Sequence, residues 1–361
     1  MGSTVVVSDL HMGARPLDVF GTTGAESFVS CLVWLPLGTT LVLAGDVWDF
    51  LTAPPYDRLD VLDAPAKARL LAAEHADVME AVARFGALPG NRVVVLPGNH
   101  DPEVCRPDVW AALWSGLPSG LEPPPLPRPS FTFTAGSRRV RVEHGDRPDP
   151  LNATDYLSVP WDTFQYPRGS RYVVDTVNPI ARELPWVKTV LPEWPAVPIL
   201  VSALRPDLAV SRLPGELTRR LRDLAEPYLS GLMGDGPGLS CRVAARALAR
   251  LNRYAQEGEP GADEFAEAAL ACPEDLTIFG HTHTAKIARR GARLYLNAGT
   301  WQEQLILPPG GDVVELSRWI DALGRGDYPH RIVPTFVRVN PDGYAGLYGW
   351  DGWGENMVWE G

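Results

Sequence analysis

Short apolar runs recur along the first hundred residues, and each one ends in a polar turn. The runs Thr4–Val7, 39–44 and Arg92–Leu96 are rich in β-branched residues and too short for helices, so they predict buried strands. Between them, apolar residues at helical spacing predict helices over 25–35 and 63–85. Continuous rather than alternating apolar strands, separated by helices, favour a largely parallel sheet that is covered on both faces.

The second predicted helix carries its own start signals. Asp63 is a candidate N-cap, and Pro65 falls in the first turn, where a missing backbone N–H is tolerated. His75 lies inside this helix, and we expect it on the surface. Further along the chain, the patterns predict a hairpin over 131–133 and 139–143, strands over Leu276–Phe279 and 293–296, and a hairpin over Thr335–Val339 and 344–348.

The middle of the chain departs from this rhythm. Residues 155–206 contain eight prolines and three tryptophans, and we expect prolines at this density to exclude long helices. Helical patterns return over 213–232 and 239–255. We therefore expect a core made of 1–146 and 274–361, with 147–273 as an insertion that is either a lid or a structural brace.

Composition restricts the class of protein. The 361 residues are 45% hydrophobic with a formal net charge of −11, which disfavours a nucleic-acid surface because phosphates are neutralised by clustered Lys and Arg. Four separated cysteines with no C-x-x-C pair argue against disulfides or a thiolate zinc site. An immediate strand leaves no room for a signal peptide, and no apolar run is long enough to span a membrane. We expect a cytoplasmic protein.

Candidate chemistry lies directly after five of the apolar runs. Five of the seven histidines are in these turns, and only His75 and His330 lie elsewhere. Carboxylate, amide and imidazole groups suit divalent Mn, Fe or Zn. Because the ends of buried strands hold polar groups rigidly, the pattern predicts a metal centre. The five turns read Asp9-x-His11, Asp46-x-x-Asp49, Asn99-His100-Asp101, His144-Gly145 and His281-x-His283.

In this order the five turns resemble the motifs of the calcineurin-like metallophosphoesterases. The resemblance covers residues 1–146 and 274–350 but not the middle of the chain. It implies an α/β sandwich of two mixed β-sheets flanked by helices, here with a large Pro/Trp-rich and helical insertion. It also implies a phosphoesterase with two divalent ions, Mn before Fe or Zn, in which a metal-bridging hydroxide attacks phosphorus.

The resemblance also assigns a role to each residue. Asp9, His11 and His283 would hold one metal. Asn99, His144 and His281 would hold the other, and Asp46 would bridge the two. His100 would contact the phosphate and protonate the leaving oxygen, with Asp49 orienting its ring. Asp49 and Asp101 could alternatively be turn-capping carboxylates, and Asp101 receives no chemical role.

Three functions remain open at this stage. The first is hydrolysis of a phosphodiester or pyrophosphate in a small or lipid-linked nucleotide, as in the UDP-diacylglucosamine hydrolase branch. Apolar residues over 179–204 would then grip acyl chains, with peripheral membrane contact, although that branch commonly has Arg where this chain has His100. The second is a DNA nuclease of the SbcD type, and the third is a metal-binding interaction scaffold with little turnover. Trp48 and Trp301 could line the pocket or simply pack in the core.

Overall fold

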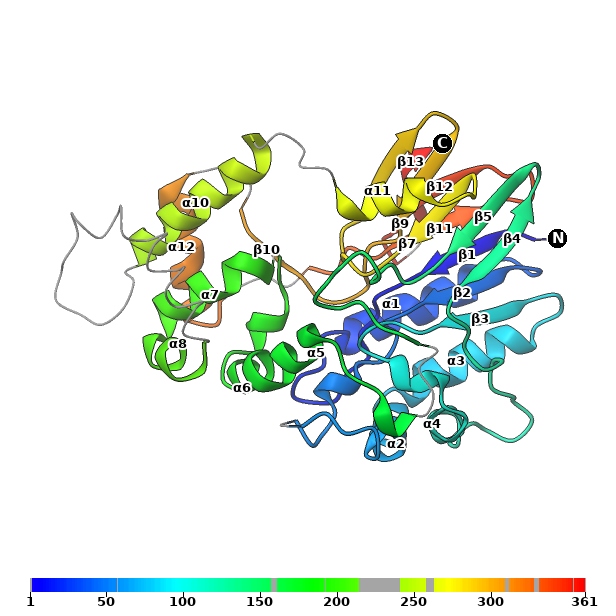
Figure 1. Ribbon diagram of the computed structural model, residues 1–361, viewed down its shortest axis with the longest axis horizontal. Helices are drawn as coiled ribbons and strands as arrows, with labels where there is room; N and C mark the ends of the chain where they lie inside the picture. Colours follow the sequence, from blue (N-terminus) through cyan, green and yellow to red (C-terminus); the bar gives the residue numbers. More distant parts are fainter. Residues whose placement is uncertain are drawn as a thin grey trace. The chain divides into compact units, whose positions relative to one another are not determined.

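A computed structural model of the chain describes residues 2–56, 58–156, 161–191, 193–213, 241–257, 263–308, 312–327, 331–352 and 354–360. The chain divides into two compact units (Figure 1). The first contains Met1–Val174, Ala262–Glu303 and Ile332–Gly361, and the second contains Asp175–Gly261 and Gln304–Arg331. The segment that we expected to form an insertion, 147–273, is thus shared between the two units.

The first unit contains a six-stranded sheet in the order β13-β12-β11-β1-β2-β3. Strands β1 (Thr4–Val7), β2 (Thr40–Ala44) and β3 (Arg92–Leu96) are parallel, as the apolar runs predicted. Strands β11 (Thr335–Val339) and β12 (Ala345–Trp350) form the predicted hairpin, and β11 pairs with β1 in antiparallel orientation. Strand β13 (Glu355–Glu360), which the sequence did not predict, adds an antiparallel edge.

A second, five-stranded sheet has the order β4-β5-β7-β9-β8. Strands β4 (Phe131–Ala135) and β5 (Arg138–Val142) form the other predicted hairpin. Strands β5, β7 (Leu276–Phe279) and β9 (Arg293–Asn297) are parallel, and β8 (Lys286–Arg290) pairs antiparallel with β9. The expectation of one largely parallel sheet is therefore wrong, whereas the fold class of two mixed sheets flanked by helices is confirmed.

The two sheets pack face to face, and β1 shows why its apolar run is continuous. Val6 belongs to the core between the sheets, together with Val142 and Ile278. Val5 and Val7 point the other way, into the core under the helices. Helix α11 (Glu264–Ala271) lies against β7 and β9 on the outer face of the second sheet (Figure 1). It packs there on Phe279 and Tyr295. Both faces of the central strands β1 and β7 are thus buried.

Four helices cover the first sheet's outer side or lie beside it: α1 (Gly21–Trp34), α2 (Ala64–Glu74), α3 (Ala76–Ala87) and α4 (Pro107–Leu113). The predicted helix 63–85 is broken at His75, whose φ of −119° interrupts it. The expectation of a surface His75 is wrong: the residue is 5% exposed, and Nε2 lies 2.8 Å from the carbonyl oxygen of Gly13. Asp63 precedes α2 as predicted, but its carboxylate pairs with Arg58 instead of capping the helix.

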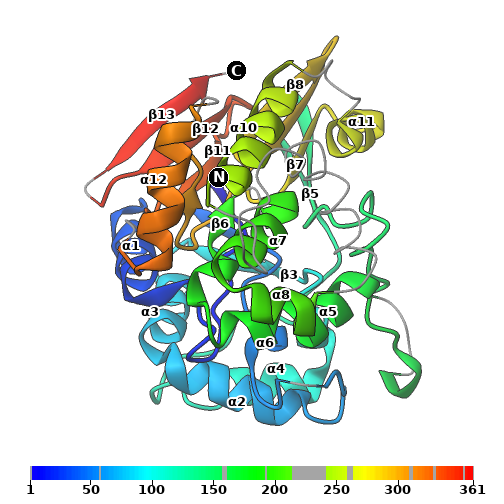
Figure 2. The same ribbon diagram turned by 90° about the vertical axis from the view of Figure 1, so that its left-hand side faces the viewer.

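The second unit is mainly helical, and α10 and α12 lie side by side in it (Figure 2). The prolines do not prevent α7 from running for 12 residues, because Pro195 falls in its first turn and Pro198 is accommodated inside it. The helix predicted over 239–255 is confirmed as α10, whereas most of the one predicted over 213–232 falls outside the described residues. The unit's elements are α6 (Asn178–Ala181), α7 (Glu193–Leu204), α8 (Pro206–Arg212), α10 (Cys241–Glu257), α12 (Val313–Gly324) and the strand pair β6 (Val190–Leu191) and β10 (Leu305–Ile306).

The described part of the chain contains neither a membrane-spanning helix nor a disulfide. None of its helices has the length and apolar character needed to cross a membrane. All four cysteines are free thiols, as their spacing predicted.

Candidate metal centre

All the predicted site residues lie in the first unit, in turns that follow the carboxyl ends of strands. These turns meet because β1, β2 and β3 are parallel in one sheet, while β5 and β7 are parallel in the other. Three groups of carboxylate and imidazole atoms result in which the ligand atoms all lie within 4.8 Å of one another. These groups are Asp9, His11 and His283; His11, Asp46 and His100; and Asp46, His144 and His281.

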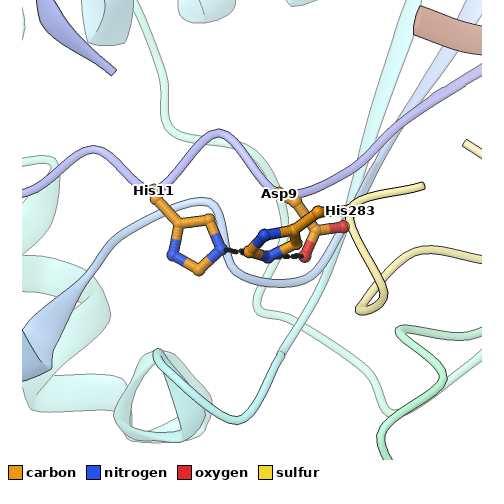
Figure 3. Close-up of side chains that lie close together, drawn as sticks. All are labelled: Asp9, His11 and His283. Atoms are coloured by element: carbon orange, nitrogen blue, oxygen red, sulfur yellow. Dashed lines mark hydrogen bonds and ion pairs between the residues drawn. The ribbon is translucent and has the colours of Figure 1, made fainter. Parts of the chain in front are cut away.

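The first group joins the turn after β1 to the turn after β7 (Figure 3). His11 Nε2 lies 3.0 Å from His283 Nε2, and Asp9 Oδ1 lies 3.3 Å from His283 Nε2. Asp9 and His11 are buried, whereas the side chain of His283 is 21% exposed. Three potential ligand atoms therefore converge at the end of the first sheet.

The predicted ligands of the other ion, Asn99, His144 and His281, lie in the turns after β3, β5 and β7, and we call them the second group. His144 Nε2 lies 3.1 Å from Asn99 Oδ1, and the rings of His144 and His281 are 5.2 Å apart. Asp46 stands between the groups, because its Oδ2 lies 3.7 Å from His11 Nε2 and 3.3 Å from His144 Nε2. Asp46 is thus the carboxylate that both groups share.

The backbone of the site is strained in a way that matches this ligand set. In the described part of the chain, five residues other than glycine have positive φ, and all five belong to the predicted metal ligands: Asp9 (56°), His11 (50°), Asp46 (51°), His281 (68°) and His283 (55°). Left-handed backbone is uncommon outside glycine and collects at functional sites, where the surrounding structure holds it in place. In the described part of the chain, left-handed backbone outside glycine thus coincides with predicted ligand positions.

The residues present fit a divalent cation. Asp9 Oδ1 is buried and accepts no hydrogen bond from the described residues. His11 Nε2 and His283 Nε2 face each other, although only one of two neutral imidazoles can donate in such a contact. A cation shared by these atoms would satisfy all three, and oxygen with imidazole nitrogen is a common donor set for Mn, Fe and Zn. The site therefore supports divalent metal binding; the identity and number of ions stay a prediction.

The charges of the site perturb one another. Burial raises the pKa of Asp9, but the neighbouring His11 and His283 outweigh it and hold that pKa well below its usual range. Burial lowers the pKa of His144, yet the Asp46 carboxylate raises it well above its usual value. Groups with shifted pKa values and opposite charge gather at functional sites.

Asp101, for which the sequence suggested only a turn-capping role, holds two turns of the site together. Its carboxylate accepts hydrogen bonds from the backbone N–H groups of four residues, namely Gly98, Asp46, Val47 and Trp48. Burial, followed by the charge of Asp46, raises the pKa of Asp101 to about 7. Asp101 thus ties the turn after β3 to the turn after β2 and fixes the approach of Asp46.

His100 and Asp49 form the predicted pair. His100 Nδ1 lies 3.0 Å from Asp49 Oδ1, and the backbone N–H of His100 donates to Asp46 Oδ1 at 2.8 Å. Asp49 also accepts from the backbone N–H of Leu51 at the start of a 3-10 turn, so orientation of the ring and turn capping occur together. The role of His100 as an acid stays a prediction, because its ring also belongs to one of the three groups that could hold a metal.

The structure adds partners that the motifs did not include. Asp149 Oδ2 lies 3.2 Å from His281 Nε2, and the Gln302 side-chain amide lies 2.7 Å from His283 Nδ1. Asn297 Nδ2 donates to the carbonyl of Gly280 and so supports the turn that carries both histidines. Gln302 follows β9 by five positions and Asp149 follows His144 by five positions, so both lie near predicted site turns in the sequence. Nothing in the sequence, however, pairs either of them with a particular histidine.

Trp48 and Trp301 do not line the site. Trp48 is 1% exposed and packs against Trp110 and Trp114 at ring distances of 5.8 and 6.3 Å. Trp301 is fully buried against Phe28, and its indole N–H donates to the carbonyl of Thr335. Ordinary packing is thus the role of both tryptophans.

No family model matches the sequence, and no curated protein matches it either. Among solved structures, the chain is similar to Vps29 from Entamoeba histolytica complexed with Zn²⁺, with 12% identity over 99% of this chain and 98% of that chain and a TM-score of 0.32. It is also similar to a predicted phosphoesterase from Streptococcus pneumoniae, with 11% identity over 100% of this chain and 98% of that chain and a TM-score of 0.27.

A third similar structure is a cold-active protein-tyrosine phosphatase from a Shewanella species, with 12% identity over 99% of this chain and 81% of that chain and a TM-score of 0.31. TM-scores this low carry no argument. The assignment of the fold therefore rests on the two mixed sheets of this chain, and the assignment of the site rests on the side chains that meet at their ends.

Proposed function

We propose that this chain is a metal-dependent phosphoesterase that hydrolyses a phosphodiester or pyrophosphate bond in a small or lipid-linked nucleotide. The observation that carries the proposal is the position of Asp46, whose Oδ2 lies within 3.7 Å of His11 Nε2 on one side and 3.3 Å of His144 Nε2 on the other. A carboxylate shared by two ligand groups is what a pair of neighbouring ions requires.

The residues divide the work as follows. Asp9, His11 and His283 would hold one ion; Asn99, His144 and His281 would hold the other, with Asp46 common to both. When bound, the two ions supply an activated water and offset the negative charge that develops on the phosphoryl group. Manganese is our first choice, with iron or zinc as alternatives, because the donors are oxygen and nitrogen without thiolate.

In this proposal His100 donates a proton to the oxygen of the leaving group. Asp49 Oδ1 lies 3.0 Å from His100 Nδ1, which leaves Nε2 as the nitrogen that can give a proton to the departing oxygen. Asp49 in turn is 1% exposed, so its carboxylate keeps the ring in one orientation.

The lipid-linked form of the substrate has less support than the reaction itself. The apolar residues of 179–204 that would grip acyl chains include Ile180, Trp186, Val187 and Leu200, and each of these is at most 3% exposed. Side chains buried to this extent offer no open apolar wall. We therefore favour a small nucleotide-type phosphodiester or pyrophosphate over a lipid-linked one.

A substrate panel tests the proposal. The purified protein, with Mn, Fe, Co, Ni or Zn added, is assayed on an aryl monoester, an aryl diester, a cyclic nucleotide, a UDP-sugar lipid and linear duplex DNA. We expect Mn-stimulated turnover of the aryl diester, lost in Asp46→Ala and His144→Ala and kept in the exposed control Asp77→Ala. Absence of turnover with every metal favours the scaffold, and cleavage of DNA by the wild type favours an SbcD-type nuclease.

A further inference from the structure

His281 has a carboxylate partner that belongs to none of the five motifs. Asp149 Oδ2 lies 3.2 Å from His281 Nε2, and the two side chains are 20% and 8% exposed. Asp149 stands five residues after His144, in the loop that follows β5. One loop therefore carries a candidate metal ligand and, a short distance later, a carboxylate that contacts another candidate ligand.

Asp149 is held in place by its own loop. Its Oδ1 accepts the backbone N–H of Leu151 at 2.8 Å, and its Oδ2 accepts the side-chain amide of Asn152 at 2.7 Å. The backbone N–H of Asp149 donates to the carbonyl of Asp146 at 2.9 Å. A residue fixed by these three hydrogen bonds can orient a ring that its carboxylate contacts.

The ring of His281 is also confined by its other neighbours. Phe265 of α11 lies 5.6 Å from it, centroid to centroid, at an interplanar angle of 49°. His144 lies 5.2 Å away, with the two rings nearly perpendicular at 77°. With both neighbours in place, the edge of the ring that carries Nε2 is directed at Asp149.

We propose that Asp149 is a positioning residue, which accepts the Nε2–H of His281 and so leaves Nδ1 with the lone pair that a metal ion needs. Histidines that bind metals commonly give their second N–H to a carboxylate, which fixes the tautomer and the orientation of the ring. This inference rests on the proposed function, because it requires a metal centre. It adds a residue to that centre which acts through His281 and does not touch the substrate.

A purely structural role for Asp149 makes a different prediction, and the substitution Asp149→Asn separates the two. The amide oxygen of the variant would still accept the backbone N–H of Leu151, since Asn supports such turns as well as Asp does. With that oxygen engaged, the amide NH₂ would face His281 Nε2 as a donor and favour the opposite tautomer. The backbone hydrogen bonds of the loop would remain and only the one from the Asn152 side chain would be lost, while the metal-binding nitrogen of His281 would be protonated.

The experiment measures Mn²⁺ affinity by titration calorimetry in the full-length wild type, Asp149→Asn, Asp149→Ala and the same-loop control Thr154→Ala. Melting temperatures are recorded in chelator. We expect the Asn variant to lose affinity about 10- to 100-fold at one of two sites, with a melting temperature that falls less than in the Ala variant because the backbone hydrogen bond to Leu151 is kept. The Ala variant should lose similar affinity and also melt earlier, and the control should bind like the wild type.

The outcomes separate this inference from the proposed function. Wild-type protein that binds no Mn²⁺ would remove the proposed function and this inference with it. Wild-type binding with unchanged affinity in the Asn variant would overturn the positioning role alone. Loss of one Mn²⁺ altogether in the Asn variant, even at saturating metal, would make Asp149 a ligand and equally overturn it.

Discussion

The two ligand groups that meet at Asp46 differ in how fully the protein satisfies them. In the first group, His11 Nε2 and His283 Nε2 face each other at 3.0 Å, and Asp9 Oδ1 is buried without a hydrogen bond from the described residues. All three residues have left-handed backbone. This group is strained, and Asp9 Oδ1 and the two facing Nε2 atoms lack suitable partners among the described residues.

The second group is held by ordinary hydrogen bonds. His144 Nδ1 lies 3.0 Å from the carbonyl of Ala44, and its Nε2 lies 3.1 Å from Asn99 Oδ1. His281 contacts Asp149, and of these ligands only His281 has left-handed backbone. The protein itself fixes the orientation of this group.

The difference separates two ways of building a metal site. The second group is organised by the fold, so its side chains contribute to folding whether or not metal is present. The first group is organised only in part, and its buried oxygen and facing nitrogens gain most from a cation. Substitutions should therefore affect metal binding in both groups but folding mainly in the second.

The largest effect is expected at the residue that the two groups share. Asp46→Ala removes the only carboxylate within reach of both His11 and His144 among the described residues, so it should weaken both metal sites and lower turnover by on the order of 10³-fold or more. Metal content per chain, measured beside activity, checks this. His283→Ala should weaken one site only, and equal metal content in the two variants would mean that Asp46 is not shared.

A smaller loss of turnover is expected at His100. If it protonates the leaving oxygen, His100→Ala should slow esters with poor leaving groups by roughly 10²-fold or more and esters with good leaving groups much less. Rates for a series of aryl diesters with graded leaving groups measure this. Equal losses along the series, together with reduced metal affinity, would instead assign His100 to the first ligand group.

The comparison between the groups predicts a difference in folding that needs no metal. In chelator, His144→Ala should lower the free energy of unfolding by about 1–3 kcal/mol, because a buried ring is removed together with its contacts to the Ala44 carbonyl and Asn99 Oδ1. His283→Ala, whose side chain is 21% exposed, should stay within about 0.5 kcal/mol of the wild type. Urea unfolding measures both. Similar decreases in the free energy of unfolding of the two variants would mean that the two ligand groups contribute equally to folding.

The strand pattern was sufficient to predict that the turns after β1, β2 and β3 meet, whereas His144 and His281, which follow strands of the other sheet, were added by the family resemblance. Parallel strands place their carboxyl ends at one edge, so Asp9, Asp46 and Asn99 had to converge once β1, β2 and β3 were identified. The hairpins over 131–143 and 335–348 followed from turn residues and alternation. These inferences depend on local pattern and on sheet geometry, which the sequence encodes directly.

Contacts between distant side chains could not be predicted in the same way. His75 has a helical setting that suggested exposure, yet the break between α2 and α3 turns it toward Gly13. Asp149 reaches His281 across 132 positions of sequence, and no period or motif links the two. Residues that support a site through three-dimensional contact leave no regular signal in a single sequence.

The smallest predicted effect lies outside both ligand groups, at Glu103. Burial raises the pKa of this carboxyl above its ordinary value of 4.5, although the Tyr166 hydroxyl and the charges of Lys67 and Arg106 act in the opposite direction. Glu103 is 2% exposed, and its Oε2 has no hydrogen-bond partner among the described residues. At pH values between the ordinary pKa and this raised pKa, the folded chain therefore keeps a proton that the unfolded chain releases.

This stabilisation is complete below the ordinary pKa of Glu and is lost as the pH rises through the raised pKa of the folded state. For each unit by which folding raises the pKa of Glu103, the free energy of unfolding is about 1.4 kcal/mol lower above the raised pKa than below the ordinary one. Glu103→Gln cannot ionise and still accepts from Tyr166, so its free energy of unfolding should fall less than that of the wild type across this range. Urea unfolding at several pH values in chelator measures it, with the exposed Glu122→Gln as the control. A pH dependence equal to that of the wild type would mean that Glu103 has the same pKa in the folded and unfolded chains. The unfolding free energies of the His144→Ala and His283→Ala variants could then be compared at any pH without subtracting a contribution from Glu103.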